Sequence, residues 1–236
     1  MRDGPFIPLP PDCAPGKFLR REKRFLVEVE TGGQRIWAHC NDTGSMTGLL
    51  EPGRDVILSP AANPRRKSRY TLERIRLPGG WASVNTALPN KMLEAAFHAG
   101  DLDFARGYTS IRREVRRGAS RVDAALTGPD LPRLWIECKS ATLVENNIAL
   151  FPDAKTVRGQ KHLIELIDIV NEGERAAMFY FVGRGDAVAF APAASIDPEY
   201  ARLFEEARMA GVEIYARVAR LTPEGTALDG ILPLAL

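Results

Sequence analysis

Two carboxylates and a lysine stand at a spacing that suits metal-assisted chemistry. Asp123 precedes Glu137 by fourteen residues, and one residue separates Glu137 from Lys139. Two carboxylates suit a hard divalent cation such as Mg²⁺, which takes oxygen ligands and keeps several waters. A nearby ammonium group can stabilise a developing anion or help to activate a metal-bound water. The three residues are therefore candidate catalytic groups, with Asp123 and Glu137 as metal ligands; a salt bridge among them is the alternative.

The flanking residues predict a β-hairpin that brings these side chains together. Strand side chains alternate between faces, so Glu137 and Lys139 point to one side, and Asp123 shares a face with Arg121. The segment 127–132 contains one glycine and two prolines, which is typical of a turn. Two adjacent antiparallel strands would place both acids and the lysine near each other.

The bulk composition is that of a globular protein. The chain has 236 residues, of which 45% are hydrophobic and 26% charged, enough for one large domain or two small ones. No apolar run approaches the ~18 residues of a membrane helix, so no membrane association is expected. The first fifteen residues do not resemble a secretory signal. Three cysteines without a CxxC motif favour a reduced, cytoplasmic setting.

Charge is distributed unevenly along the chain. Residues 1–121 carry 21 Lys and Arg against 13 Asp and Glu, whereas residues 122–236 carry 11 against 17. An excess of cations in the first half indicates a polyanionic partner. A solvated, arginine-rich surface is the equally weighted alternative.

The pattern of elements divides the chain into three parts. Residues 1–16 are expected to form a loose arm, and residues 17–82 show short alternating strands broken by turns, typical of a small β-barrel. Residues 83–236 predict the order helix, three strands, helix, strand, helix, strand. The fold class is therefore α+β, with a barrel followed by a mixed sheet flanked by helices.

That element order, with an Asp on the second strand and Glu-x-Lys on the third, resembles the PD-(D/E)XK nuclease core. The resemblance implies that the two acids hold a divalent ion, Mg²⁺ or Mn²⁺, and that the lysine assists the attacking water. Glu94 on the first helix and Glu114 on the first strand are further candidate metal ligands. For both glutamates, a solvated surface charge is the alternative.

Several blocks resemble the signature segments of the sugar fermentation stimulation protein A (SfsA) family. They extend from about residue 24 to 220 and are HCNDTGSM (39–46), NPRRKSRYTLE (63–73), VNTALPN (84–90), GASRVDAAL (118–126), ECKSATL (137–143) and FPDAKTVRGQKHLIEL (151–166). The resemblance implies an N-terminal OB-like barrel, a C-terminal nuclease-like domain and largely non-specific DNA binding. It also implies a bacterial or archaeal origin and a regulatory effect on sugar use. One departure is Asn41-Asp42, where the family usually has Pro-Asn.

Ten basic residues are candidate DNA contacts. A helix over 155–170 would carry one group on its first turns, where a helix N-terminus favours phosphate. A basic run beside Tyr70 suits backbone tracking and base stacking on an OB-like barrel. The third group comprises two arginines that flank Glu114 and one, Arg121, that shares the face of Asp123. For Arg121, pairing with Asp123 is the alternative to phosphate binding. The ten residues are Arg158, Lys161 and His162; Arg65, Arg66, Lys67 and Arg69; and Arg112, Arg116 and Arg121.

Two further residues receive separate interpretations. Gln160 lies on the same helix as Arg158 and is left open between reaching the metal site and packing over the sheet. Cys138 alternates with Glu137, so we expect its thiol to be buried in the core and inert.

Two functions follow from these observations. The first is a largely sequence-independent DNA-binding protein that carries a nuclease-type metal site. The second is an active Mg²⁺- or Mn²⁺-dependent nuclease that uses the same residues. The sequence leaves open whether the site cuts, which strand form is bound, the oligomeric state and the physiological target.

Overall fold

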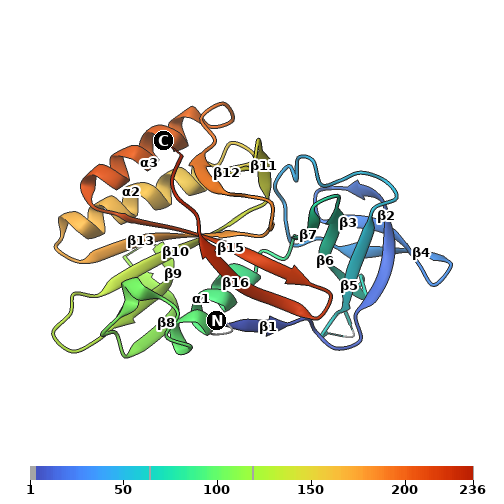
Figure 1. Ribbon diagram of the computed structural model, residues 1–236, viewed down its shortest axis with the longest axis horizontal. Helices are drawn as coiled ribbons and strands as arrows, with labels where there is room; N and C mark the ends of the chain where they lie inside the picture. The colour runs from blue at the N-terminus through green and yellow to red at the C-terminus, as the bar shows by residue number, and fades with distance from the viewer. Residues whose placement is uncertain (1–3, 64, 119, 236) are drawn as a thin grey trace.

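A β-barrel and a helix-flanked sheet lie side by side in the computed structural model, which describes residues 4–63, 65–118 and 120–235 (Figure 1). The barrel is built from residues 14–83, and the larger domain from the later residues together with an N-terminal strand at residues 6–8. This arrangement confirms the predicted α+β fold class.

Five strands close the barrel. They are β2 (Ala14–Glu22), β3 (Leu26–Thr31), β4 (Gln34–His39), β5 (Asp55–Pro60) and β6 (Tyr70–Leu77). β2 pairs with both β3 and β5, and a parallel bridge between His39 and Thr71 joins β4 to β6 and closes the ring. Val27 and Val29 are 0% exposed in the barrel core, as the alternating pattern predicts. A short strand, β7 (Gly80–Ser83), continues the barrel sheet toward the second domain.

A seven-stranded mixed sheet forms the second domain. Its strands, in spatial order, are β1 (Phe6–Pro8), β16 (Gly225–Ile231), β15 (Glu213–Thr222), β13 (Arg175–Val182), β10 (Leu134–Ala141), β9 (Ser120–Thr127) and β8 (Ser110–Arg117). The central strands β10, β13 and β15 are parallel, and the outer pairs are antiparallel. A small sheet lies beside it, made of β11 (Leu143–Glu145), β12 (Ile148–Phe151) and β14 (Ala189–Pro192).

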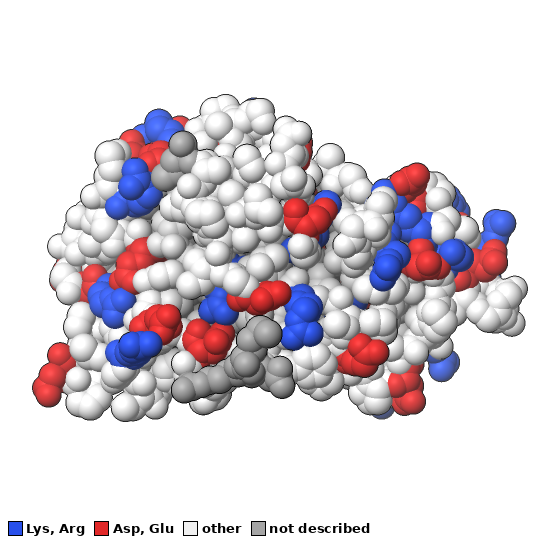
Figure 2. Space-filling view, in the orientation of Figure 1, with Lys and Arg blue, Asp and Glu red and all other residues white. Residues whose placement is uncertain are grey.

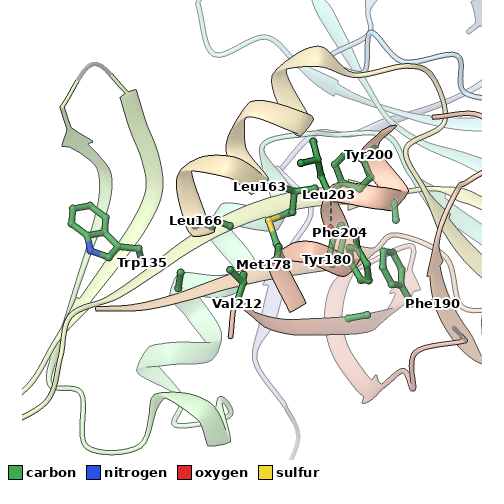
Figure 3. Close-up of a cluster of buried hydrophobic side chains, with 14 of the residues drawn as sticks. Trp135, Leu163, Leu166, Met178, Tyr180, Phe190, Tyr200, Leu203, Phe204 and Val212 are labelled. Carbon is green, nitrogen blue, oxygen red and sulfur yellow. Dashed lines mark hydrogen bonds between the residues drawn. The ribbon is translucent and has the colours of Figure 1, made fainter. Parts of the chain in front are cut away.

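Helices cover both faces of the large sheet (Figure 1). α1 (Leu88–His98) packs on one face, and α2 (Val157–Asn171) and α3 (Pro198–Ala210) pack on the other; a 3-10 turn spans Asp103–Ala105. Alternation along β13 explains the two layers: Met178 and Tyr180 face α2 and α3, whereas Phe179 faces α1. Figure 3 shows the first layer, where the buried hydroxyl of Tyr180 lies 2.5 Å from that of Tyr200.

Helices α2 and α3 both begin at side-chain caps. Thr156 Oγ1 accepts a hydrogen bond from Gly159 N at 3.0 Å at the start of α2, and Asp197 Oδ1 accepts one from Tyr200 N at 3.0 Å at the start of α3. Each cap satisfies a backbone donor that the helix leaves free. α3 ends at Gly211, whose φ of 102° favours glycine.

The N-terminal segment differs from the expected loose arm. Phe6–Pro8 forms β1 and pairs with β16, and β2 already begins at Ala14. Residues 1–3 lie outside the described part of the chain. The domain limits at 16/17 and 82/83 stay predictions. No helix among the described residues is long and apolar enough to cross a membrane.

The two domains are joined by hydrogen bonds at the β7 end. Ser83 N donates to Gly183 O at 2.9 Å, and Ala82 forms an isolated bridge with Arg184. The Arg74 side chain, 1% exposed, donates to Thr226 Oγ1 at 2.7 Å. These contacts fix the barrel on the second domain.

Acidic and basic side chains are interspersed on the molecular face of Figure 2. Many charged side chains of the structure pair, as Arg217 does with Asp101 at 2.8 Å and Arg175 with Glu213 at 2.8 Å. The uneven charge along the chain therefore does not become a single basic patch on this face.

Candidate functional site

Asp123 lies where two paired strands separate. The ladder between β9 and β10 runs from Leu126 opposite Leu134 to Ala124 opposite Ile136. Beyond this ladder, the Asp123 side chain replaces a backbone acceptor: its Oδ2 accepts a hydrogen bond from Cys138 N at 2.9 Å. Its Oδ1 accepts a second bond from Asn90 Nδ2 of α1 at 3.0 Å. Both oxygens are thereby oriented.

Glu137, Lys139 and His162 form a tight cluster beside it. Lys139 Nζ lies 2.6 Å from Glu137 Oε1 and 2.8 Å from His162 Nδ1, and His162 Nδ1 also contacts Glu137 Oε1. The side chains of Glu137, Lys139 and His162 are only 6%, 14% and 12% exposed. Arg158 Nε lies 3.4 Å from the outer nitrogen of His162. The cluster is therefore a nearly buried polar site.

The two carboxyl groups are shifted in opposite directions. Burial raises the pKa of Asp123, and the negative charge of Glu137 raises that pKa further. Burial alone would raise the pKa of Glu137 too, but the hydrogen bond from His162 and the charge of Lys139 outweigh it and lower that pKa overall. Glu137 is thus the more acidic of two interacting carboxyl groups, an arrangement typical of functional sites.

The start of α2 is held by Asp197. Asp197 Oδ2 accepts a hydrogen bond from Thr156 N at 2.9 Å, and Gln160 Nε2 donates to Asp197 Oδ1 at 2.9 Å. Gln160 therefore points to the N-terminus of α3, and the interpretation that it reaches the metal site is wrong. Cys138 is 8% exposed and burial raises its pKa well above the ordinary value, as expected for an inert thiol.

The cluster opens into a cleft of about 460 Å³ between the two domains. The second domain supplies the cluster and the segment 150–156, and the barrel supplies Arg24 and the segment 42–44. Arg24, Lys155 and Arg158 are exposed, so cations stand on both walls.

The barrel wall is fastened to the second domain by Asp153. Asp153 Oδ2 accepts a hydrogen bond from Met46 N at 2.8 Å, and Ser45 Oγ donates to the Asp153 carbonyl. Gly44 permits this approach, because a Cβ there would stand 2.6 Å from Asp153 Oδ1. The Arg21 guanidinium donates to Gly44 O at 2.9 Å and steadies the same loop.

The residues that depart from the family pattern have clear roles. Asn41 Nδ2 donates to Asn85 Oδ1 at 3.0 Å, which a proline could not do. Asp42 Oδ1 accepts a hydrogen bond from Gly44 N at 2.8 Å and so shapes the turn. Burial raises the pKa of Asp42, and the charge of Asp153 adds to this.

The other two predicted acids pair with arginines. Glu94 lies on α1 four residues after Asn90, and its Oε2 is 3.3 Å from Arg113 Nη1. Glu114 Oε2 is 2.6 Å from Arg121 Nε. Neither glutamate is among the described residues that line the cleft. Their role as metal ligands stays a prediction that the cleft geometry does not support.

The predicted DNA contacts divide by location. Arg158 and His162 line the cleft, whereas Lys161 is exposed on α2 outside that lining. Arg112 and Arg116 are exposed on β8. Arg121 is held by its glutamate partner and does not pair with Asp123.

The basic run lies on the loop between β5 and β6. Arg65, Lys67 and Arg69 are exposed, but Arg66 is half-buried and donates to two backbone carbonyls and to Thr71 Oγ1. None of the four is among the described residues that line the cleft. Arg66 therefore supports its own loop.

Four residues of the site were not predicted from the sequence: Asn90, Asp153, Arg24 and Lys155. Asn90, Asp153 and Lys155 stand inside segments already singled out as blocks, which was the available signal. Arg24 stands outside these blocks, and its meeting with Lys155 across a cleft depends on the packing of two domains.

Comparisons with known proteins agree over both domains. The SfsA N-terminal OB domain model matches residues 19–84, and the sugar fermentation stimulation protein RE domain model matches residues 87–225. A sugar fermentation stimulation protein homolog of Maridesulfovibrio salexigens is 50% identical over 233 residues, covering 98% of each chain. A homolog of Lawsonia intracellularis is 46% identical and covers 97% of each chain.

A solved structure matches the whole fold. It is the structure of Pyrococcus furiosus SfsA in complex with Ca²⁺, with a TM-score of 0.90 and 31% sequence identity, covering 98% of both chains. The barrel, the mixed sheet and their relative placement are therefore shared with that protein.

Proposed function

The chain belongs to the sugar fermentation stimulation protein (SfsA) family, and we propose that it binds DNA with little sequence preference and carries a nuclease-type divalent-cation site. The observation that carries this proposal is the meeting of Asp123, Glu137 and Lys139 in a cleft with cations on both walls. The effect on sugar use that the family's name describes would then follow from DNA binding.

The positions of the cations support the DNA-binding part. OB-folds bind oligonucleotides through the loop between their first two strands and the loop between their last two. Here the first of these loops contains Arg24, and the second contains Arg65, Lys67 and Arg69. Such contacts neutralise phosphates, so affinity should fall with salt and depend little on sequence.

The donor set at the cluster fits a hard divalent cation. Asp123 and Glu137 offer carboxylate oxygens, which Mg²⁺ and Mn²⁺ prefer. The charge of Glu137 raises the pKa of Asp123, and a divalent cation would relieve this repulsion. No group of three or more His, Cys, Asp and Glu suited to a metal occurs among the described residues, so water would complete the coordination. The Ca²⁺ complex of the Pyrococcus furiosus relative supports the binding of a divalent cation by this chain.

An active nuclease is the second candidate, and the intact triad favours it. A bound cation would supply Lewis-acid stabilisation of phosphoryl charge and a more acidic water. Lys139 places its ammonium beside Glu137 and would stabilise the anion that develops on the phosphate. His162 holds Glu137 and Lys139 in place, and Arg158 stands at the mouth, where it would orient a phosphate.

We also place the protein in the cytoplasm. Cys13, Cys40 and Cys138 are all free thiols, which suits a reducing compartment.

Metal binding tests the site directly. Glu137→Gln removes one of the two anions, so its affinity for Mn²⁺ and Ca²⁺ should fall by roughly 100-fold or more in calorimetric titrations. Glu145→Gln is the matched control, because Glu145 is exposed on β11 outside the cleft, and its affinity should equal that of the wild type. Equal affinity in both variants would remove the cation site from the proposal.

Cleavage assays separate the two candidates. Single-stranded and duplex DNA are incubated with Mg²⁺, Mn²⁺ or EDTA, and Lys139→Ala is compared with Lys17→Ala, a lysine paired with Asp55 on the barrel surface. A nuclease loses cutting but keeps binding in Lys139→Ala, while Lys17→Ala cuts normally. Binding without cutting in the wild type leaves the DNA-binding protein.

A further inference from the structure

The acid cluster can be reached only from inside the cleft. The Glu137 side chain is 6% exposed and that of Lys139 is 14% exposed. A phosphate on the outer surface of the molecule therefore cannot approach these groups. The strand that carries the phosphate has to enter the space between the barrel and the second domain.

The two walls of the cleft touch each other at one end, which leaves no room there for a double helix. Ser45 Oγ and Met46 N of the barrel both donate to Asp153 of the second domain, so the walls stand closer together there than the width of duplex DNA, whose major groove alone is about 12 Å wide. The barrel segment 42–46, called the roof here, closes one side of this space.

The roof is fixed at both of its ends. The Met46 side chain is 1% exposed in the barrel core, and its backbone nitrogen donates to Asp153 at 2.8 Å. Arg21 donates to the carbonyls of Asp42 and Gly44 at 2.8 and 2.9 Å. Because Ser83 and Arg74 tie the domains together elsewhere, the cleft does not have a free hinge.

The walls of the cleft suit one extended strand. Arg24 stands on the barrel side, and Lys155 and Arg158 stand on the α2 side, so the phosphates of a bound strand would have cations on both sides. Phe151 and Leu150 add apolar surface to the lining, on which an unpaired base can rest. A charged groove with apolar or aromatic surface is the usual platform for single strands.

We propose that the cleft takes a single DNA strand and that the roof, clasped by Asp153, excludes duplex DNA from the acid cluster. This inference rests on the proposed function, because it names the form of DNA that this site accepts. Duplex DNA can still contact the exposed loop between β5 and β6, where three cations lie outside the cleft.

The test compares a single-stranded oligonucleotide with a dumbbell duplex of the same sequence, in which loops join the two strands at both ends. An oligonucleotide of about 12 nucleotides and a closed dumbbell duplex are each added to the wild-type protein in EDTA, and hydrogen exchange is followed by mass spectrometry. The single strand should protect peptides covering residues 150–162, and the dumbbell should leave them unprotected. Affinity measured by anisotropy should favour the single strand by about tenfold or more.

Two variants should release the roof from Asp153 by different routes, while the contacts of Ser83 and Arg74 keep the two domains together. Asp153→Ala removes the carboxylate that holds Met46 N. Gly44→Ala places a Cβ 2.6 Å from Asp153 Oδ1, so this carboxylate must turn away while the net charge stays the same. Each variant should let the dumbbell protect residues 150–162 and bring the affinity ratio close to one. Asp103→Ala, an aspartate whose side chain is 78% exposed, is the matched control and should keep the wild-type ratio.

The outcomes separate this inference from the proposed function. Equal protection of 150–162 by dumbbell and single strand in the wild type overturns the inference while DNA binding stands. Absence of binding by either DNA overturns the proposed function and the inference together. A variant that loses its cooperative melting transition leaves the wild-type comparison as the deciding measurement.

Discussion

The loop between β5 and β6 and the cleft collect cations in different ways. The loop holds four Lys and Arg within the five residues 65–69, but Arg66 is hydrogen-bonded to its own loop. The cleft gathers Arg24, Lys155 and Arg158 from two distant segments and places them around two acids. The density of basic residues along the chain therefore gives only the local amount of charge. The fold determines which of these cations lie together along the route of one nucleic-acid strand.

This difference has a consequence for rigidity. Loop cations at the ends of flexible side chains bind phosphate as exposed point charges, which salt screens readily. The backbone that carries the cleft cations is held by hydrogen bonds, from Arg21 to Arg24 O at 2.9 Å and from Thr156 N to Asp197 at 2.9 Å, so fewer degrees of freedom are lost when a strand binds. The cleft should accordingly be sensitive to distant supports, and the loop only to its own residues.

The largest effect is expected at Asp197, which supports the α2 wall of the cleft. Asp197 is 2% exposed and accepts hydrogen bonds from Thr156 N, Tyr200 N and Gln160 Nε2. Asp197→Ala removes a helix cap and several charge-assisted bonds, so unfolding free energy should fall by about 3 kcal/mol. Asp168→Ala on the exposed side of α2 is the control and should change it by no more than about 0.5 kcal/mol. Urea denaturation measures both, and equal losses would contradict the support role.

The same residue gives a pH dependence. Burial alone would raise the pKa of Asp197, but the hydrogen bonds from Thr156 N, Tyr200 N and Gln160 lower it overall. A carboxyl whose folded pKa is lowered stabilises the protein above its unfolded pKa, near 3.9, and loses that contribution as the pH falls through the folded pKa. Wild-type stability should therefore fall below about pH 4 more steeply than that of Asp197→Ala. If the unfolding free energies of the wild type and of Asp197→Ala changed in parallel with pH, Asp197 would not be the source of this pH dependence.

Two triple variants compare the regions directly. Each removes three cations: Arg24, Lys155 and Arg158 from the cleft, or Arg65, Lys67 and Arg69 from the loop, with Arg66 kept. Since each single-strand phosphate contact contributes about 0.7 to the slope of log affinity against log salt, the cleft triple should reduce that slope by about 2. The loop triple should reduce the slope for single strands by less than about 1. Anisotropy titrations at several salt concentrations measure both, and equal reductions would remove the distinction between the regions.

Features of the fold and the site that depend on residues close together in the sequence could be predicted, and features that depend on distant residues could not. Alternation has a period of two residues, so the hairpin and the shared face of Glu137 and Lys139 were visible locally. The closed barrel and the mixed sheet followed from the same short patterns and from the family resemblance. The local pattern could not tell an arginine that supports its own loop, such as Arg66, from an exposed arginine that is free to contact phosphate, such as Arg65.

The rest of the site depends on contacts between segments far apart in the chain. Glu94 was singled out as an acid on the correct helix, but Asn90, one turn earlier, donates to Asp123. An asparagine is uncharged, so nothing in its residue type identified Asn90 as a contact of the site. Asp153 and Met46 meet across more than a hundred residues, and no periodicity records such a meeting.

A smaller effect is expected at Arg66, which separates structural from binding charge in the loop. Arg66→Ala removes bonds to Tyr70 O at 3.1 Å and Thr71 Oγ1 at 3.0 Å, so unfolding free energy should fall by about 1 to 2 kcal/mol. Arg65→Ala, at the exposed neighbour, should leave stability within about 0.5 kcal/mol. If thermal melts showed the reverse order, the loop would owe its shape to a different residue.

The smallest effect is expected at Asn41, next to the roof of the cleft. Asn41→Ala loses one hydrogen bond to Asn85 Oδ1, which still accepts from Ala87 N at 3.0 Å, so the cost should be about 1 kcal/mol. Asn41→Asp should cost more, because an anion would then face the same oxygen. Asn85 cannot turn its amide to relieve this, since its Nδ2 donates to Glu73 Oε2 at 2.8 Å. Equal stability of the two variants in urea denaturation would mean that the amide of Asn85 is free to flip, and that the roof is held by Asp153 and Arg21 alone.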